Sequence, residues 1–290
     1  MFFPLQIALL VVLWIEAVVG IIINAFIVAV IVFWWIHSGK VKTIDFILAC
    51  LGLSRLTLII VFVIVPWIPV NVEIILATSM FVTFCSLWFA TKLCFFYCMK
   101  ICNYCSCILV FLESNVFKMI FWTLFTSITP SLICTLPFNW IVFIKITNNT
   151  SDGSINVNRK LFILYFSGTS LPFFIFCVAV SLLIRSLWKH TRHLTRNNPG
   201  FNKAQLRAHV FAVKGMVSFL VIYIIFFISS NLKFEPSMSN NTTVQPVLSI
   251  IICSYPTVHS VILVLVNRKM KKALCCFLCC LREDISSESN

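Results

Sequence analysis

Long runs of apolar residues, separated by short polar segments, fill almost all of this 290-residue chain. Each run is about as long as the roughly 20 apolar residues that a helix needs to cross a bilayer, or longer. The runs do not alternate polar and apolar residues, as the strands of a membrane barrel do. The pattern therefore predicts an all-α membrane protein, a seven-transmembrane-helix bundle that forms one domain over residues 1–290. The predicted helices cover residues 5–35, 46–70, 74–99, 116–144, 161–188, 210–232 and 244–266, and residues 267–290 form a tail.

The composition supports a membrane protein, because 60% of the residues are hydrophobic and only 11% are charged. A soluble domain has about 25% charged residues, so soluble enzymes, disordered chains and secreted disulfide scaffolds are excluded. The HExxH, GxSxG, GxxxxGK and GxGxxG motifs are absent from the sequence. We therefore expect no enzymatic activity, no cofactor and no bound metal. The net charge of +13 is divided among short segments between the apolar runs, which argues against a nucleic-acid partner.

Lysine and arginine residues indicate the orientation of the predicted helices. Of the 22 in the chain, sixteen lie in segments on one side of the predicted bundle and four on the other, with Arg55 and Lys92 inside helices. Cytoplasmic loops of membrane proteins carry the excess of basic residues. We therefore expect the amino terminus outside the cell and the carboxyl terminus in the cytoplasm.

Glycosylation signals of the Asn-X-Ser/Thr type fall in the two segments that are assigned to the outside. One pair starts at Asn148 and Asn149, and the other pair starts at Asn240 and Asn241. Their confinement to these segments agrees with the orientation. We favour glycosylation at Asn148 and Asn149, because the outer loop at 147–160 is long enough to hold a sugar clear of the membrane.

Four cysteines lie close together in the tail, directly after a cluster of basic residues. They are Cys275, Cys276, Cys279 and Cys280. Cysteines beside basic residues at a membrane surface are typical of S-palmitoylation, and the basic residues suit anionic lipid headgroups. Membrane lipids are therefore an expected partner. A zinc site is the alternative, although the tail has no second Cys/His cluster to complete one.

Polar residues inside the predicted helices lie at similar depths. Arg55 is ten residues and Asn24 eleven residues from the cytoplasmic end of its helix, roughly 15 Å at 1.5 Å per residue. His259 and Ser260 of the seventh helix fall near the same layer. Because a charged side chain in lipid is costly without partners, we expect these four residues to form a polar network with Arg55 as its cation. Two interpretations stay open, a static brace and a switch that rearranges on activation.

Several ordered stretches of the chain resemble one receptor family. They include LACLGLSR at 48–55, WFAT at 88–91, SYPTVHS at 254–260 and NRKMK at 267–271. Together they resemble the bitter taste (type 2 taste) receptors, which are seven-helix G protein-coupled receptors. The resemblance implies a multi-pass receptor of the plasma membrane that detects small bitter-tasting molecules and activates a heterotrimeric G protein.

The resemblance also implies where two sites lie. A ligand cavity is expected between helices two, three, five, six and seven, for a small-molecule agonist that enters from outside. Its candidate lining residues are Trp67, Ser79, Thr83, Leu87, Phe226, Ser249 and Cys253. The G protein surface is expected at the cytoplasmic ends of helices three, five and six. Its candidate contacts are Tyr97, Lys100, Lys189, His209 and Lys214. A homo-oligomer is left open.

The chain departs from the family pattern at the outer ends of helices three and seven. It has Ser79, Thr83 and Ser249 where relatives often carry Trp, Asn and an acidic residue. We therefore expect a less polar cavity than in several relatives. A vomeronasal-type pheromone receptor of the same fold is the alternative function, and a small membrane transporter, which would show internal repeats or a row of intramembrane charges, is another. Nothing in the sequence assigns a role to Glu16 or Lys92.

Overall fold

The structure, a computed structural model, describes residues 2–63, 72–102, 116–148, 154–197, 203–235 and 244–288. Within these ranges the chain forms helices and no strand. The helices are α1 (Phe2–Ser38), α2 (Thr43–Val63), α3 (Val72–Cys102), α5 (Val116–Asn148), α6 (Ser154–Asn197), α7 (Lys203–Phe234), α8 (Val244–Val266) and α9 (Arg268–Glu288). In this part of the chain seven helices, α1 to α8, are long and apolar enough to cross a membrane, which confirms the predicted number.

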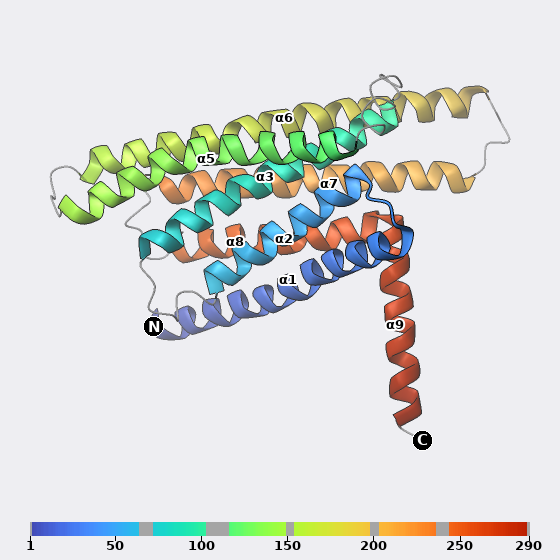
Figure 1. Cartoon of the computed structure of the whole chain (residues 1–290), viewed down its shortest axis with the longest axis horizontal. Helices are drawn as coiled ribbons and strands as arrows, with labels where there is room; N and C mark the ends of the chain where they lie inside the picture. Colours follow the sequence, from blue (N-terminus) through green and yellow to red (C-terminus); the bar gives the residue numbers. More distant parts are fainter. Residues whose placement is uncertain are drawn as a thin grey trace.

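The seven membrane-length helices lie side by side and form one elongated bundle (Figure 1). α3 packs against α2, α5 and α6, while α1 packs against α2 and α8, and α7 packs against α6 and α8. The outer surface of the bundle is apolar, with exposed side chains such as Ile22, Leu136 and Phe174. An apolar surface of this extent is typical of a protein whose outside meets lipid.

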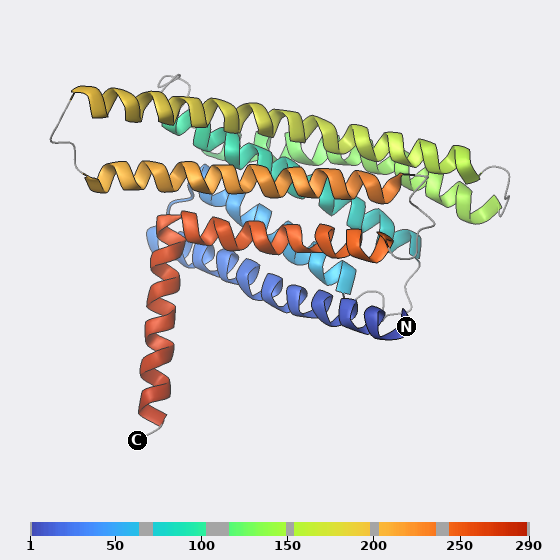
Figure 2. The ribbon, with the colours of Figure 1, turned by 180° about the vertical axis from the view of Figure 1, so that it is seen from behind.

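The two ends of the bundle differ in the elements that they hold. One end holds the amino terminus and is called the N-terminal end here (Figure 1). The other end holds α9, which leaves the bundle at a steep angle, and is called the α9 end (Figure 2). Which end faces the cytoplasm stays a prediction from the distribution of the basic residues.

Two helices extend well beyond the apolar runs that predict them. α6 covers Ser154–Asn197, whereas the apolar run is 161–188, and α7 begins at Lys203, whereas its run begins at 210. Within the described residues, the segment between these two predicted helices, 189–209, is therefore helical. An apolar run marks only the part of a helix that lies in lipid, and residues such as Lys, Arg, Gln and Leu continue a helix readily in water.

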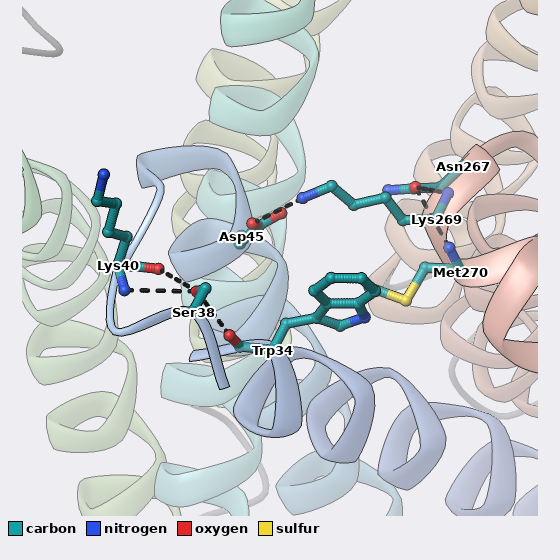
Figure 3. Close-up of polar contacts among 7 residues, drawn as sticks. All are labelled: Trp34, Ser38, Lys40, Asp45, Asn267, Lys269 and Met270. Atoms are coloured by element: carbon teal, nitrogen blue, oxygen red, sulfur yellow. Dashed lines mark hydrogen bonds and ion pairs between the residues drawn. The ribbon is translucent and has the colours of Figure 1, made fainter. Parts of the chain in front are cut away.

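The predicted tail also forms a helix, α9, and Asn267 is the residue that separates it from α8. The Asn267 side-chain oxygen accepts hydrogen bonds from the backbone N–H groups of Lys269, at 3.0 Å, and Met270, at 3.5 Å (Figure 3). Asparagine commonly begins helices in this way, by satisfying amides of the first turn. The Lys269 ammonium forms an ion pair with the Asp45 carboxylate at 3.2 Å, and Met270 is buried. These contacts hold the start of α9 against the start of α2.

Candidate ligand cavity and polar network

A cavity of about 680 Å³ lies between the helices at the N-terminal end of the bundle. This volume is within the usual range for small-molecule sites. α1, α2, α3, α7 and α8 supply most of the wall. The lining residues are Leu10, Leu13, Trp14, Glu16, Ala17, Leu58, Ile59, Phe62, Leu76, Met80, Thr83, Ser86, Leu87, Tyr165, Phe226, Lys233, Phe234, Ser249, Ile252, Cys253, Tyr255, Pro256 and Thr257.

Aromatic rings and aliphatic side chains make up most of this wall. The ring centroids of Phe226 and Tyr255 are 4.3 Å apart, and so are those of Tyr165 and Phe234. The hydroxyl of Thr83 donates to a carbonyl of its own helix at 2.7 Å, so this donor is already used. The cavity is therefore suited to a mostly apolar molecule with few polar groups.

Most of the residues that the sequence suggests for the cavity do line it. They are Thr83, Leu87, Phe226, Ser249 and Cys253. Ser79 is not a lining residue, because it is buried on α3 and its hydroxyl donates to the Leu76 carbonyl at 2.9 Å. Trp67 lies outside the described residues. The helices also differ from the expectation: α1 lines the cavity extensively, whereas the fifth transmembrane helix, α6, contributes Tyr165.

Two charged lining residues, Glu16 and Lys233, were not among the sequence candidates. Glu16 of α1 accepts a hydrogen bond from the Ser254 hydroxyl at 2.5 Å, and the Lys233 ammonium of α7 donates to the Ser249 hydroxyl at 2.9 Å. Both residues are therefore held by serines of α8. A charge inside an apolar run is the sequence signal for such a site. Only the packing of α1 and α7 against α8 shows that the two charges share one cavity.

Deeper in the bundle, Arg55, Asn24 and Ser260 form one chain of hydrogen bonds across α2, α8 and α1. Nη1 of Arg55 donates to the Ser260 hydroxyl at 2.8 Å, and that hydroxyl donates to Oδ1 of Asn24 at 2.7 Å. Nδ2 of Asn24 donates to the Gly20 carbonyl at 2.8 Å. All three side chains are fully buried, with exposed fractions of 0%. The chain of bonds therefore connects three helices without access to water.

His259 is not part of this chain of hydrogen bonds, although it lies beside it on α8. Its ring packs against Phe219, with centroids 4.5 Å apart, and against Tyr255, at 5.6 Å. The Arg55 guanidinium in turn lies 5.7 Å from the centroid of the Tyr255 ring, within the range of a cation–π contact. Because Tyr255 also lines the cavity, one side chain contacts both the cavity and the polar network.

Lys92, which has no partner that the sequence could suggest, is held by α5. Its ammonium donates to the Thr123 carbonyl and to the hydroxyls of Thr126 and Ser127, each at 2.6 Å. Three donors of an ammonium thus meet three oxygens, which accounts for a cation inside the membrane span. Lys92 therefore braces α3 against α5.

The candidate G protein contacts belong to helices that meet at the α9 end. Tyr97 is half-buried on α3, and Lys214 is exposed on α7. Lys100, Lys189 and His209 are residues of α3, α6 and α7. In α9, Cys275, Cys276 and Cys279 are exposed, and Cys280 belongs to the same helix. Of the favoured glycosylation sites, Asn148 is the last residue of α5, and Asn149 lies outside the described residues.

Comparison with known proteins decides the family of the chain. Residues 1–282 match the taste receptor protein (TAS2R) family. The chain belongs to this family. Taste receptor type 2 member 7 of Rattus norvegicus is 32% identical over an alignment 296 residues long with its gaps, and this alignment includes 91% of this chain and 92% of the relative. Member 4 of Pan paniscus is 31% identical over 284 residues (89% and 93%), and member 40 of Gallus gallus is 30% identical over 280 residues (89% and 90%).

Membership of the type 2 taste receptor family confirms several predictions from the sequence. The chain is a bitter-taste type of G protein-coupled receptor and a multi-pass protein of the plasma membrane. It belongs to a family of receptors rather than enzymes. The match extends over nearly the whole chain, and it therefore favours a taste receptor over the vomeronasal and transporter alternatives.

Proposed function

We propose that this taste receptor binds a small, mostly apolar bitter molecule in its cavity and then activates a heterotrimeric G protein at the α9 end. The observation that carries the proposal is the position of α8. Its outer part, including Ser249 and Tyr255, lines the cavity, and Ser260 farther along the helix belongs to the polar network. At Asn267 the chain then turns into α9. A single helix thus runs from the cavity toward the opposite end of the bundle.

In this proposal the bundle has two states, and the agonist binds one of them more tightly. A ligand shifts such an equilibrium by no more than its difference in affinity for the two states. The agonist contacts Phe226 on α7 and Tyr255 on α8, so it acts on two helices that also reach the α9 end. A change in how these helices pack would alter the surface that the G protein meets.

The α9 end is the cytoplasmic face in this proposal, and the amino terminus is outside the cell. The candidate G protein contacts there are Tyr97, Lys100, Lys189, His209 and Lys214. Palmitoyl groups on the cysteines of α9 would anchor that helix to lipid, since acylated juxtamembrane cysteines hold a chain at the membrane surface. The whole chain acts as one receptor domain.

Replacing Phe226 by alanine is expected to weaken the response to an agonist. The Phe226 ring is buried, packs on Tyr255 and lines the cavity, so its removal takes away a large apolar contact for the ligand. Agonists are first identified by calcium release in cells that express the receptor with a promiscuous G protein. At matched surface expression, Phe226→Ala should raise the half-maximal agonist concentration at least tenfold, since each factor of ten needs about 1.4 kcal/mol.

The matched control for this experiment is Phe174→Ala. The Phe174 ring is exposed on the lipid-facing surface of α6, and its loss should leave the response unchanged. Equal responses of the two variants would show that the agonist does not bind in this cavity. A receptor that gives no calcium signal with any bitter compound would contradict the proposed function itself.

Replacing Asn148 and Asn149 together by glutamine tests both the glycan and the orientation. α5 ends at Asn148 and α6 begins at Ser154, so Asn148 lies at the N-terminal end of the bundle. If this end is outside the cell, the double variant should lose a glycosidase-sensitive shift in mass and should reach the cell surface less well. An unchanged mass shift in the double variant would mean that Asn240 or Asn241 carries the sugar. A wild-type receptor that shows no mass shift would contradict glycosylation at any of these sites.

A further inference from the structure

Charge is distributed unevenly over the cavity wall. Of the lining residues in the described part of the chain, only Glu16 and Lys233 carry a formal charge. They come from α1 and α7, which lie on different sides of α8. A charge in an apolar, lipid-embedded wall is expensive and usually has a partner or a function.

The carboxylate of Glu16 is only partly satisfied. Its Oε1 accepts the hydrogen bond from the Ser254 hydroxyl at 2.5 Å, and that hydroxyl also contacts the Ile250 carbonyl of its own helix at 2.8 Å. Its Oε2 is shielded from solvent and has no hydrogen-bond partner among the described residues. Buried polar atoms in proteins nearly always have a partner, and a charged one that lacks it is strongly unfavourable. The carboxylate can therefore accept a further donor.

Lys233 is not that donor. Its ammonium donates to Ser249, and the described residues show no ion pair between Lys233 and Glu16. The two serines that hold the charges, Ser249 and Ser254, are five residues apart on α8, which corresponds to about 7.5 Å along a helix. The cavity therefore presents a negative charge near α1 and a positive charge near α7, both facing a mostly apolar space.

We infer that the cavity takes an amphiphilic organic cation, with its protonated amine against the carboxylate of Glu16, which lines the cavity, and its apolar body along the aromatic wall of Phe226 and Tyr255. This inference rests on the proposed function and names its class of ligand. A protonated amine supplies both the missing hydrogen-bond donor and a compensating charge, and charge-assisted hydrogen bonds are about twice as strong as neutral ones. Lys233 repels an amine, so it favours the orientation in which the amine lies at the α1 side of the cavity.

The test compares two probes that share one apolar body, 6-phenylhexylamine, which is protonated at neutral pH, and the neutral 6-phenylhexan-1-ol. The full-length receptor is purified in lipid nanodiscs, and the affinity of each probe is measured from the shift in its thermal unfolding. The wild-type receptor should bind the amine at least tenfold more tightly than the alcohol. Glu16→Gln keeps the shape of the side chain but removes its charge, so the amine loses its charge-assisted hydrogen bond. The affinities of the variant for the amine and the alcohol should therefore lie within about threefold of each other.

Lys233→Met is the matched variant, because it removes the other charge of the same cavity. It should keep the preference for the amine or increase it, since a repulsive charge is gone. Equal binding of the two probes by the wild-type receptor would overturn the inference, and so would a preference that survives in Glu16→Gln. The comparison of the amine and the alcohol on the wild-type receptor tests the inference even if a variant does not fold.

Binding is measured without a G protein, so this inference and the proposed function fail separately. Binding of the amine together with a receptor that never signals would contradict the proposed function only. Signalling by neutral agonists together with no preference for the amine would contradict this inference only.

Discussion

Replacing Arg55 by leucine is expected to leave insertion into the membrane intact and to reduce the agonist response strongly. Leucine favours lipid, whereas an arginine at the centre of a membrane helix costs about 2.5–3.5 kcal/mol on insertion scales. The variant loses the hydrogen bond of Arg55 to Ser260 and the contact with the Tyr255 ring. Since Tyr255 lines the cavity, this loss uncouples the ligand-binding part of α8 from α2. At matched surface expression we expect at least a tenfold higher agonist concentration for half-maximal calcium release, as a hydrogen bond to a charged group contributes about 1.5–3 kcal/mol.

A double-variant cycle with Asn24→Leu shows whether Arg55 and Asn24 act together. Ser260 accepts from Arg55 and donates to Asn24, so removal of either residue already breaks the same chain of bonds. The effects of the two replacements should therefore be less than additive, as groups in one network couple. Leu53→Ala on the exposed side of α2 is the control and should leave the response unchanged. Strict additivity, or a normal response of Arg55→Leu, would contradict the network.

Replacing Gly20 by leucine is expected to prevent most of the receptor from reaching the cell surface. Gly20 lies where α1 meets α2 and α8, and a Cβ atom there would overlap the Thr257 hydroxyl and would lie 2.7 Å from Cδ1 of Ile59. Overpacking of this kind costs about 1–3 kcal/mol, and here it also pushes α1, which lines the cavity, away from α2 and α8.

The control for this variant is Ala29→Leu on the same helix. Ala29 is exposed to lipid, so a larger apolar side chain there meets no protein neighbour and should be tolerated. Surface labelling of a tagged receptor, compared with the total amount made, measures both variants. Equal surface levels of Gly20→Leu and Ala29→Leu would show that α1 does not approach α2 and α8 as closely as the structure has it.

The sequence is informative about the helices because lipid imposes one simple rule on each of them. A membrane helix satisfies its own backbone hydrogen bonds and needs only a long enough run of apolar residues, whatever its neighbours are. The apolar runs therefore predict seven spans, and they fail only at the ends, where α6 and α7 continue into water. The search for apolar runs also misses α9, because this amphipathic helix contains no long apolar run.

The polar network shows which contacts can be predicted from the depth of a residue along its helix and which cannot. Asn24, Arg55 and Ser260 could be placed at one depth from residue counting, and they do form a chain of hydrogen bonds. His259, at the same depth, packs against Phe219 instead. Depth follows from the rise of 1.5 Å per residue, but the direction of a side chain depends on how each helix is rotated in the bundle.

The amino-acid sequence alone determines that this chain is a seven-helix membrane receptor, because hydropathy and ordered family motifs are properties of the chain itself. Only the tertiary structure decides that α1 lines the cavity, that Glu16 and Lys233 face one space, and that Lys92 braces α3 against α5. In a uniformly apolar helix every face is compatible with lipid, so the sequence does not say which face packs inward. Packing selects that face through close contacts such as those at Gly20, and the chemistry of the cavity follows from that selection.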